Sequence, residues 1–174
     1  SLGQGAFLGV GAYASAILAE RLQFPFLLAL PCAGGVTALL GLFFGIPSLR
    51  LKGLYLAIAT LAAQFIIEFA IIHWDSLTNG PHGLMVPAAS IGPLVFDSDK
   101  SYYYLVLVVV ILAAIFTLNL FRTRVGRAFM AIRDRDISAG VIGVNIYRYK
   151  LYSFFVSSFM VGIAGGLWAH YIEI

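Results

Sequence analysis

Three polar residues recur at four-residue intervals inside a strongly apolar stretch of the chain: Thr60, Gln64 and Glu68. This spacing places side chains on one face of an α-helix. An ionisable group at membrane depth usually faces a bundle interior or a watery cavity, so these residues are candidates for lining a path through a membrane. Gln4, in a Gly-rich opening, is a similar candidate. Glu68 has a second interpretation, in which it lies near the outer interface and is solvated and incidental.

Catalytic chemistry is not legible in the sequence. There is no Gly-x-x-x-x-Gly-Lys-Ser/Thr motif and no Gly-Lys dipeptide, so the chain has no phosphate-binding loop for ATP. His73, His82 and His170 lack metal-ligand spacing, and we expect structural or interfacial roles for them. Cys32 is the single cysteine, which excludes an internal disulfide, and we expect it to be a small buried hydrophobe. The chain is predicted not to be an enzyme and to hold no metal or cofactor.

The composition places the chain in a lipid bilayer. Of its 174 residues, 61% are hydrophobic and 11% are charged, whereas soluble domains are about 45–50% apolar and about 25% charged. The net charge is +3, but the cations gather beside apolar segments, which excludes the exposed basic face of a nucleic-acid-binding protein. The chain lacks an initiator methionine and closes on an apolar run. We therefore expect one membrane-spanning domain over residues 1–174, truncated at both ends.

Five apolar segments are candidate membrane helices: residues 5–19, 24–46, 54–72, 102–121 and 151–172. About 20 apolar residues cross the hydrocarbon as a helix, and backbone amides cannot stay unpaired in lipid. We predict an all-α fold, a polytopic transmembrane helical bundle. The first segment is short, so it either begins before Ser1 or is a half-helix. The break at residues 46–48 either ends a helix at the membrane surface or interrupts it.

Glycines spaced four residues apart suggest where helix backbones approach closely. They form three pairs: Gly5 and Gly9, Gly41 and Gly45, Gly162 and Gly166. Generic close packing of a helix bundle explains such pairs without any functional role.

Basic residues are divided unequally between alternate loops. Residues 47–53 and 122–150 together hold nine cations, and residues 20–23 and 73–101 hold two. Loops rich in Lys and Arg stay on the cytoplasmic side, so the first pair of loops is predicted to be cytoplasmic. The loop over residues 73–101, with turn signals at Gly80-Pro81 and Gly92-Pro93, is predicted to face outward.

The segment over residues 124–149 is too polar to span and too regularly patterned to be a slack linker. Apolar residues recur at helical intervals, with charges beside them: Val125, Ala128, Phe129 and Ile132. Small residues follow, where a partner surface would approach closely. We predict a cytoplasmic helix that docks into another protein, as amphipathic helices do in grooves. A solvated, salt-bridged loop without a partner is the alternative.

Four stretches of the chain, taken in order, resemble one family. They are residues 1–13 (SLGQGAFLGVGAY), residues 49–61 (LRLKGLYLAIATL), residues 74–83 (WDSLTNGPHG) and residues 126–150, from GRA through GVN to YK. Together they resemble the branched-chain amino-acid ABC transporter permeases, the M-type subunit of the Liv system. The resemblance covers all 174 residues, and the full permeases of that family are longer than this chain.

The resemblance implies a permease subunit that moves branched-chain or similar small amino acids across the inner membrane. Its implied partners are a second permease subunit, two ATP-binding subunits that drive transport, and a periplasmic substrate-binding protein. In such importers the coupling helix of the permease carries Glu-Ala-Ala, three residues and Gly. Alignment on Gly143 puts Ile137, Ser138 and Ala139 in the Glu-Ala-Ala positions, so this chain lacks the glutamate.

The missing glutamate leaves open which side chain makes the polar contact with the ATPase, with Asp134 and Asp136 nearby. The resemblance implies an ATPase-coupling site at eight positions: Arg133, Asp134, Asp136, Ser138, Ala139, Gly140, Gly143 and Asn145. Three alternatives stay open. They are an ion-coupled secondary transporter with Glu68 as its proton site, an ABC permease for urea or short amides, and a non-transporting membrane scaffold.

Overall fold

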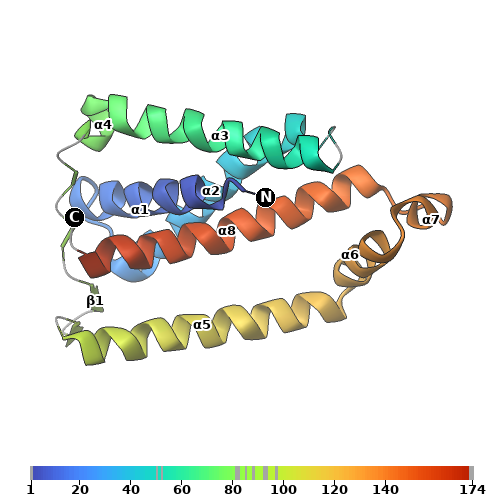
Figure 1. The fold of residues 1–174 in the computed structure, drawn as a ribbon. Helices are drawn as coiled ribbons and strands as arrows, with labels where there is room; N and C mark the ends of the chain where they lie inside the picture. The colour runs from blue at the N-terminus through green and yellow to red at the C-terminus, as the bar shows by residue number, and fades with distance from the viewer. Residues whose placement is uncertain are drawn as a thin grey trace.

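The computed structural model describes residues 2–49, 51, 53–80, 83–84, 86–87, 89–91, 94–96 and 98–172. Within them the chain forms helices α1 (Gln4–Glu20), α2 (Phe26–Ser48), α3 (Leu54–His73), α4 (Asp75–Thr78), α5 (Asp99–Arg122), α6 (Arg124–Asp134), α7 (Asp136–Val141) and α8 (Ile146–Ile172). Strands β1 (Ser90–Ile91) and β2 (Leu94–Val95) pair antiparallel. The long helices run side by side; α4 and β1 lie at one end of the bundle, and α6 and α7 project from the other (Figure 1).

Four helical stretches are long and apolar enough to cross a membrane: Phe26–Pro47, Leu54–His73, Asp99–Arg122 and Ile146–Ile172. The spanning helices predicted from the apolar runs are confirmed at these four positions. α1 is shorter, with 17 residues. It starts beside α3, where the backbone N–H of Leu2 donates a hydrogen bond to the Thr60 hydroxyl (3.1 Å).

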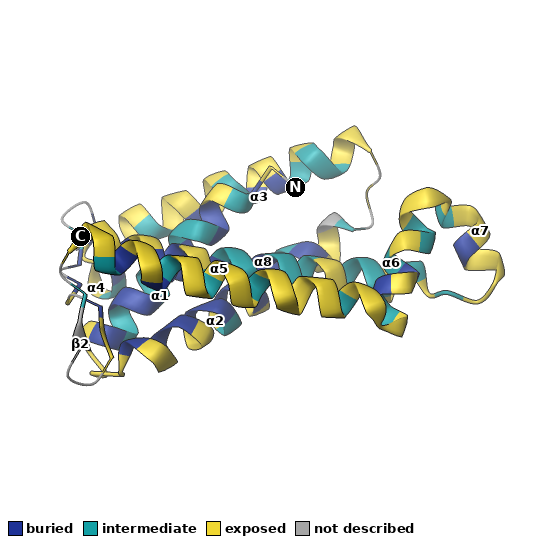
Figure 2. Ribbon diagram, turned by 90° about the horizontal axis from the view of Figure 1, so that it is seen from below, coloured by how far each residue is buried: buried dark blue, intermediate teal, exposed yellow. Residues whose placement is uncertain are grey.

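The core of the bundle lies where α8 packs against α1 and α2. The buried faces of these helices consist largely of small residues, among them Ala6, Ala16, Ala29, Ala33, Ala38, Gly162, Gly165 and Ala169. Small side chains let helix backbones approach closely, and this packing holds helices together where lipid offers no hydrophobic drive. Buried residues accordingly line α1, α2 and α8, whereas α5 is exposed along most of its length (Figure 2).

Glycines mark the closest approaches between these helices. A Cβ added at Gly11 would collide with the backbone of Gly162, and one added at Gly41 would collide with a serine of α8. The predicted close approach is therefore confirmed for α2 and α8. At Gly5 and Gly9 an added Cβ would meet α3 side chains only at ordinary van der Waals distance, 3.6 Å.

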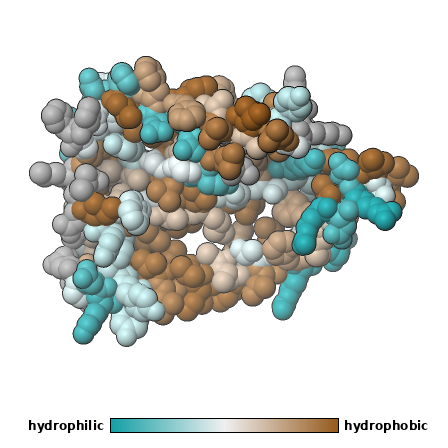
Figure 3. Space-filling model, in the orientation of Figure 1, coloured by the Kyte–Doolittle hydropathy of each residue, from teal (hydrophilic) through white to brown (hydrophobic). Residues whose placement is uncertain are grey.

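α5 is attached to the bundle at one end. Tyr102 and Leu105 are its buried side chains, and the Tyr102 hydroxyl donates a hydrogen bond to the Leu167 carbonyl of α8 (2.5 Å). Beyond this end, hydrophobic side chains cover α5, and openings are visible between α5 and α8 (Figure 3). Such a face suits contact with lipid or with another membrane helix.

The segment between α3 and α5, predicted as an outward loop, is anchored to the bundle. Its Leu84, Val86 and Ala89 are buried. The Pro87 carbonyl lies 3.0 Å from His170 Nδ1, so Nδ1 donates to it, and Nε2 then accepts from the Ser15 hydroxyl at 3.1 Å. These bonds give buried His170 the structural role predicted for it. His73 stacks on Phe69 at the end of α3, and His82 lies outside the described residues.

Charged residues gather at the two ends of the bundle. At the end with α6 and α7, which we call the basic end, lie Arg122, Arg124, Arg127, Arg133, Arg135, Arg148 and Lys150. The opposite end has Arg21 and Lys100, near the carboxylates of Glu20, Asp75 and Asp99. Arg50 and Lys52, which the sequence places with the first group, lie outside the described residues. The unequal distribution of charge thus holds for the part of the chain that the structure describes.

The course of α2 corrects the expected burial of Cys32 and shows where this helix ends. Cys32 is exposed, not buried, because the packed face of α2 is formed by Ala29, Ala33 and Thr37 at helical intervals and Cys32 lies off that face. The helix continues through Pro47 and ends at Ser48. The break at residues 46–48 is therefore a helix end, where a proline removes few backbone hydrogen bonds.

Candidate functional site

α6 forms with the apolar stripe that the sequence predicts. It begins behind Thr123, whose hydroxyl accepts a hydrogen bond from the Gly126 N–H (3.3 Å). The stripe is turned toward this same chain: Ala128 is buried, and the Phe129 ring meets the Tyr149 ring of α8 edge-on, with centroids 6.3 Å apart. Ala128 and Phe129 therefore pack partly within this chain, and docking of the segment into another protein stays a prediction.

The segment over residues 124–149, predicted as one docking helix, contains two helices and the start of a third. α6 ends at Asp134, Arg135 has extended backbone (φ −153°, ψ 98°), and α7 follows at Asp136. The last residues of the segment already belong to α8, which begins at Ile146. α7 consequently projects beyond the ends of the long helices (Figure 1).

α7 presents apolar side chains away from the rest of the chain. Ile137, Val141 and Ile142 are 79%, 83% and 76% exposed, and we call them the α7 apolar patch. Hydrophobic side chains stand beside strongly hydrophilic ones at this tip (Figure 3). Burying one such side chain fully is worth roughly 1.5–3 kcal/mol. These three side chains lie outside the spanning helices. The sequence pattern did not single them out, because charged and small residues surround them.

The end of α7 is fixed by a local hydrogen-bond pattern around Gly143. The Val144 N–H donates to the Ala139 carbonyl (3.0 Å), and the Gly143 N–H donates to the Gly140 carbonyl (3.1 Å). With Gly143 at φ +88°, this is the Schellman arrangement that ends helices at glycine. Asn145 then caps α8, since its Oδ1 accepts from the Arg148 N–H (3.1 Å).

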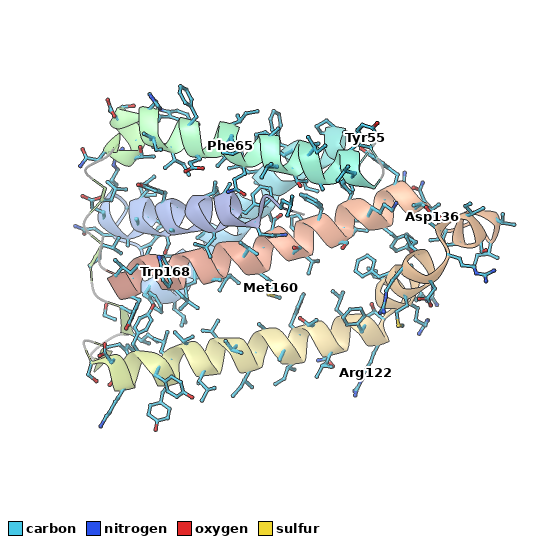
Figure 4. The ribbon with its side chains drawn as sticks, in the orientation of Figure 1. Tyr55, Phe65, Arg122, Asp136, Met160 and Trp168 are labelled. Atoms are coloured by element: carbon cyan, nitrogen blue, oxygen red, sulfur yellow. The ribbon has the colours of Figure 1, made fainter. Side chains whose placement is uncertain are left out.

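The structure distributes the remaining predicted coupling residues over several environments. Asp134, Ser138 and Gly140 are exposed, and Asp136 is half-buried at the start of α7 (Figure 4). Ala139 is 2% exposed, so it packs within the chain and cannot form part of an outer surface. Arg133 is exposed and also lines a cavity.

That cavity, of about 550 Å³, lies between the basic end and the middle of the bundle. Its walls come from α1, α3, α5, α6, α8 and the turn after α2; the lining residues are Gln4, Leu49, Leu51, Leu56, Phe121, Phe129, Met130, Ile132, Arg133, Tyr149, Lys150, Ser153, Phe154 and Ser157. We call it the α6 cavity. Its size falls in the range of small-molecule sites, about 300–1,000 Å³.

Gln4 closes the inner part of the α6 cavity. Its Nε2 donates a hydrogen bond to the Ser157 hydroxyl of α8 (3.0 Å). Its Oε1 is buried and has no hydrogen-bond partner within the described part of the chain. A buried acceptor left without a donor costs about 1–3 kcal/mol, so the position of Gln4 between α1 and α8 carries a cost in stability.

The other three predicted path residues fall into three different environments. Thr60 is buried and donates to the Ala57 carbonyl (2.9 Å). Gln64 is half-buried, with its amide group near Gly5. Glu68 is exposed. The prediction that they share one face is only partly right, because each four-residue step turns about 40° beyond a full helical turn.

Among the described residues, no three His, Cys, Asp or Glu side chains come together in a way that could hold a metal ion.

Fold and surfaces together define a polytopic α-helical membrane protein with a projecting helical segment at its basic end. All of residues 1–174 match the family described as branched-chain amino acid transport system / permease component, and the chain belongs to that family. Two curated relatives, from Salmonella typhimurium (strain LT2) and Escherichia coli (strain K12), are 33% and 32% identical. Each is named a high-affinity branched-chain amino acid transport system permease protein LivM. No solved structure matches the chain.

The alignments cover 97% of this chain and 45% of each relative, so the chain spans less than half the length of these curated relatives. The resemblance noted in the sequence is confirmed. The chain belongs to this family of permease components and is a multi-pass protein of the inner membrane.

Proposed function

We propose that the protein is the membrane-spanning permease subunit of an ATP-driven importer that carries branched-chain amino acids. The family description and the names of both relatives specify branched-chain amino acids, which favours them over urea or short amides. The α7 apolar patch is the observation that supports the ATP-driven part of this proposal, because it stands outside the spanning helices and needs a partner to cover it. The sequence has no nucleotide-binding motif, so that partner supplies the hydrolysis.

The basic end faces the cytoplasm in this proposal, because loops rich in Lys and Arg are retained there. Two ATP-binding subunits then approach from the cytoplasm, and a second permease subunit completes the path. A periplasmic substrate-binding protein delivers the amino acid at the opposite end, where the anchored segment between α3 and α5 offers it a fixed surface.

The α7 apolar patch enters a groove of the ATPase, and the exposed carboxylate of Asp134 and the half-buried one of Asp136 supply polar contacts at its rim. Movement of α7 reaches α6 through the single residue Arg135 and reaches α8 through the turn at Gly143. α6 forms one wall of the α6 cavity, and α8 forms another. Closure of the ATPase therefore changes the shape of the α6 cavity at the cytoplasmic end of the path.

The α6 cavity serves as the cytoplasmic end of the path, with Gln4 at its inner part. Gln64 is the next polar residue along the path toward the opposite end, because its amide lies close to Gly5, the residue after Gln4. Thr60 holds the start of α1 against α3. Glu68 lies further along α3 and borders the path only where a second permease subunit covers this helix.

The test uses the full-length permease reconstituted with its partner subunits in vesicles. Val141→Asp, and the charge reversal of Asp134 and Asp136 to Lys, are compared with unmodified protein and with Val141→Leu, which keeps the patch apolar. ATP-driven leucine uptake and ATPase activity are measured on the same vesicles. We expect Val141→Asp and the charge reversal to lower uptake per ATP hydrolysed, while Val141→Leu retains it.

Binding of the ATPase to each permease variant is measured by co-purification. Weaker co-purification of Val141→Asp, with normal membrane insertion, supports the docking surface. Full uptake and full ATPase binding by Val141→Asp would remove this mechanism. Uptake that runs on an ion gradient without ATP would favour the ion-coupled alternative instead.

A further inference from the structure

The two charged side chains that line the α6 cavity are both cations. Arg133 comes from α6 and Lys150 from α8, and no Asp or Glu is among its described lining residues. We infer that the α6 cavity is a binding site for the carboxylate of a small apolar amino acid, held by Arg133 and Lys150. This inference rests on the proposed function and adds to it the orientation and location of the solute at the cytoplasmic end.

The lining residues of α8 show how the cavity is organised from rim to floor. Tyr149, Lys150, Ser153, Phe154 and Ser157 recur at intervals that place them on one side of a helix. Tyr149 lies near the start of α8, and Ser157, bonded to Gln4, lies about 12 Å further along the helix axis. The cations therefore stand at the rim nearest the basic end, and the neutral polar pair of Gln4 and Ser157 stands at the floor.

The walls between rim and floor suit an apolar side chain. They include the rings of Phe121, Phe129, Tyr149 and Phe154, together with aliphatic residues from α3 and α6. An amino acid whose carboxylate meets the rim cations places its branched side chain among these rings. Its ammonium group can then face toward the floor, where Gln4 and Ser157 are the polar lining residues.

The rim cations are distinct from the other cations of the basic end. Arg124, Arg127, Arg135 and Arg148 do not line the cavity, whereas Arg133, which is also exposed, and the half-buried Lys150 do. The Arg127 guanidinium instead donates to the Arg122 carbonyl (3.4 Å). Among the described cations of the basic end, Arg133 and Lys150 are therefore the two placed to contact a solute inside the cavity.

The position of Arg133 ties this site to the coupling segment. It lies next to the last residue of α6, two residues before α7 begins, whereas Lys150 belongs to a long spanning helix. Movement of α7 changes the separation of the two cations and hence the affinity for the carboxylate. Release of the solute is then favoured in the state that separates them.

Protection of an introduced cysteine tests the site directly. Ser153 is exposed and lines the cavity, so Ser153→Cys is made in full-length permease with Cys32→Ser and every other cysteine replaced. The permease is assembled with its partners in inverted vesicles, whose outer surface is the cytoplasmic face. The rate of modification by a membrane-impermeant maleimide is measured with leucine, with leucinamide, which lacks the carboxylate, and with 4-methylpentanoate, which lacks the ammonium group.

We expect leucine and 4-methylpentanoate to slow modification and leucinamide to leave it unchanged. In Arg133→Gln or Lys150→Gln, the leucine concentration needed for half-protection rises by about tenfold, the loss expected for one charge-assisted contact. Arg127→Gln is the matched control, an exposed cation of α6 outside the cavity, and it leaves protection unchanged.

Three results would overturn the inference: no protection by leucine, equal protection by leucinamide, or modification that depends on the anionic lipid content of the vesicles and not on leucine. ATP-driven leucine uptake by the same Ser153→Cys protein separates the two failures. Leucine uptake without protection of the cysteine would contradict the carboxylate site but not the proposed function. A lack of uptake by the unmodified permease would contradict the proposed function itself.

Discussion

The hydroxyl of Tyr102 donates a hydrogen bond to the backbone carbonyl of Leu167 over 2.5 Å, and this bond ties α5 to α8 at the end opposite the basic end. The two residues share a buried cluster with Phe26 and Ala89. Toward the basic end, α5 leads into α6 through a tight turn at Thr123. α5 is thus held firmly at one end, and its other end connects to the segment that carries the α7 apolar patch.

Replacing Tyr102 with phenylalanine removes this bond and leaves the ring in place. The Leu167 carbonyl also accepts from its own helix, so we expect a loss of about 1 kcal/mol in the free energy of unfolding. The measurement is the midpoint of thermal unfolding in detergent, with Tyr103→Phe as control, since the exposed Tyr103 lies one residue away on the same helix. Equal midpoints for the two variants would show that the bond contributes nothing.

Substitution at Gly162 tests the close approach of α1 and α2 to α8. An added Cβ at Gly162 would meet the Thr37 side chain and the backbone of Gly34, so Gly162→Ala should destabilise the bundle by about 1–3 kcal/mol. Gly35 has nothing within 4 Å of an added Cβ, and Gly35→Ala is expected to be neutral or stabilising. Unfolding midpoints and the monodispersity of purified protein report both effects.

His170 links the segment between α3 and α5 to the bundle, and removing its ring should loosen that segment. His170→Ala leaves the Ser15 hydroxyl and the Pro87 carbonyl without their partner, and it empties the space beside the Phe26 ring. We expect a loss of about 2–4 kcal/mol and faster proteolysis of residues 79–98 from the side of the membrane opposite the basic end. His73→Ala, which removes an exposed ring stacked on Phe69, should leave proteolysis unchanged.

The spanning helices could be predicted from the sequence because length and apolarity alone determine them. A helix must cross about 30 Å of hydrocarbon, and the chain supplies apolar runs of that length. Contacts between helices could not be predicted in the same way. Ser15 and His170 are 155 residues apart in the sequence, and no local pattern shows that they meet.

Periodicity predicted the α6 helix and failed to show what its apolar stripe touches. A stripe of Ala128 and Phe129 has the same spacing whether it packs on α8 or on another protein. The α7 apolar patch was missed for a related reason. Ile137 and Val141 look like ordinary core residues until the structure leaves them 79% and 83% exposed. The sequence pattern that could have predicted the patch is a cluster of apolar residues within a charged segment that lies outside all the membrane-spanning stretches.

A substitution series at Gly143 separates two reasons for a glycine at the end of α7. Gly143 adopts φ +88° and has open space where a Cβ would be, so the backbone conformation requires glycine and contacts within the chain do not. Asparagine enters this region of φ more readily than alanine, although it is larger. If conformation is the requirement, Gly143→Asn keeps more uptake per ATP hydrolysed than Gly143→Ala, and Gly143→Val keeps least. If a partner surface must approach Gly143 closely, the loss follows side-chain size and asparagine is worse than alanine. Uptake and ATPase activity in reconstituted vesicles decide between the two orders. Gly35→Ala is the control, because Gly35 lies in α2 and has nothing within 4 Å of an added Cβ.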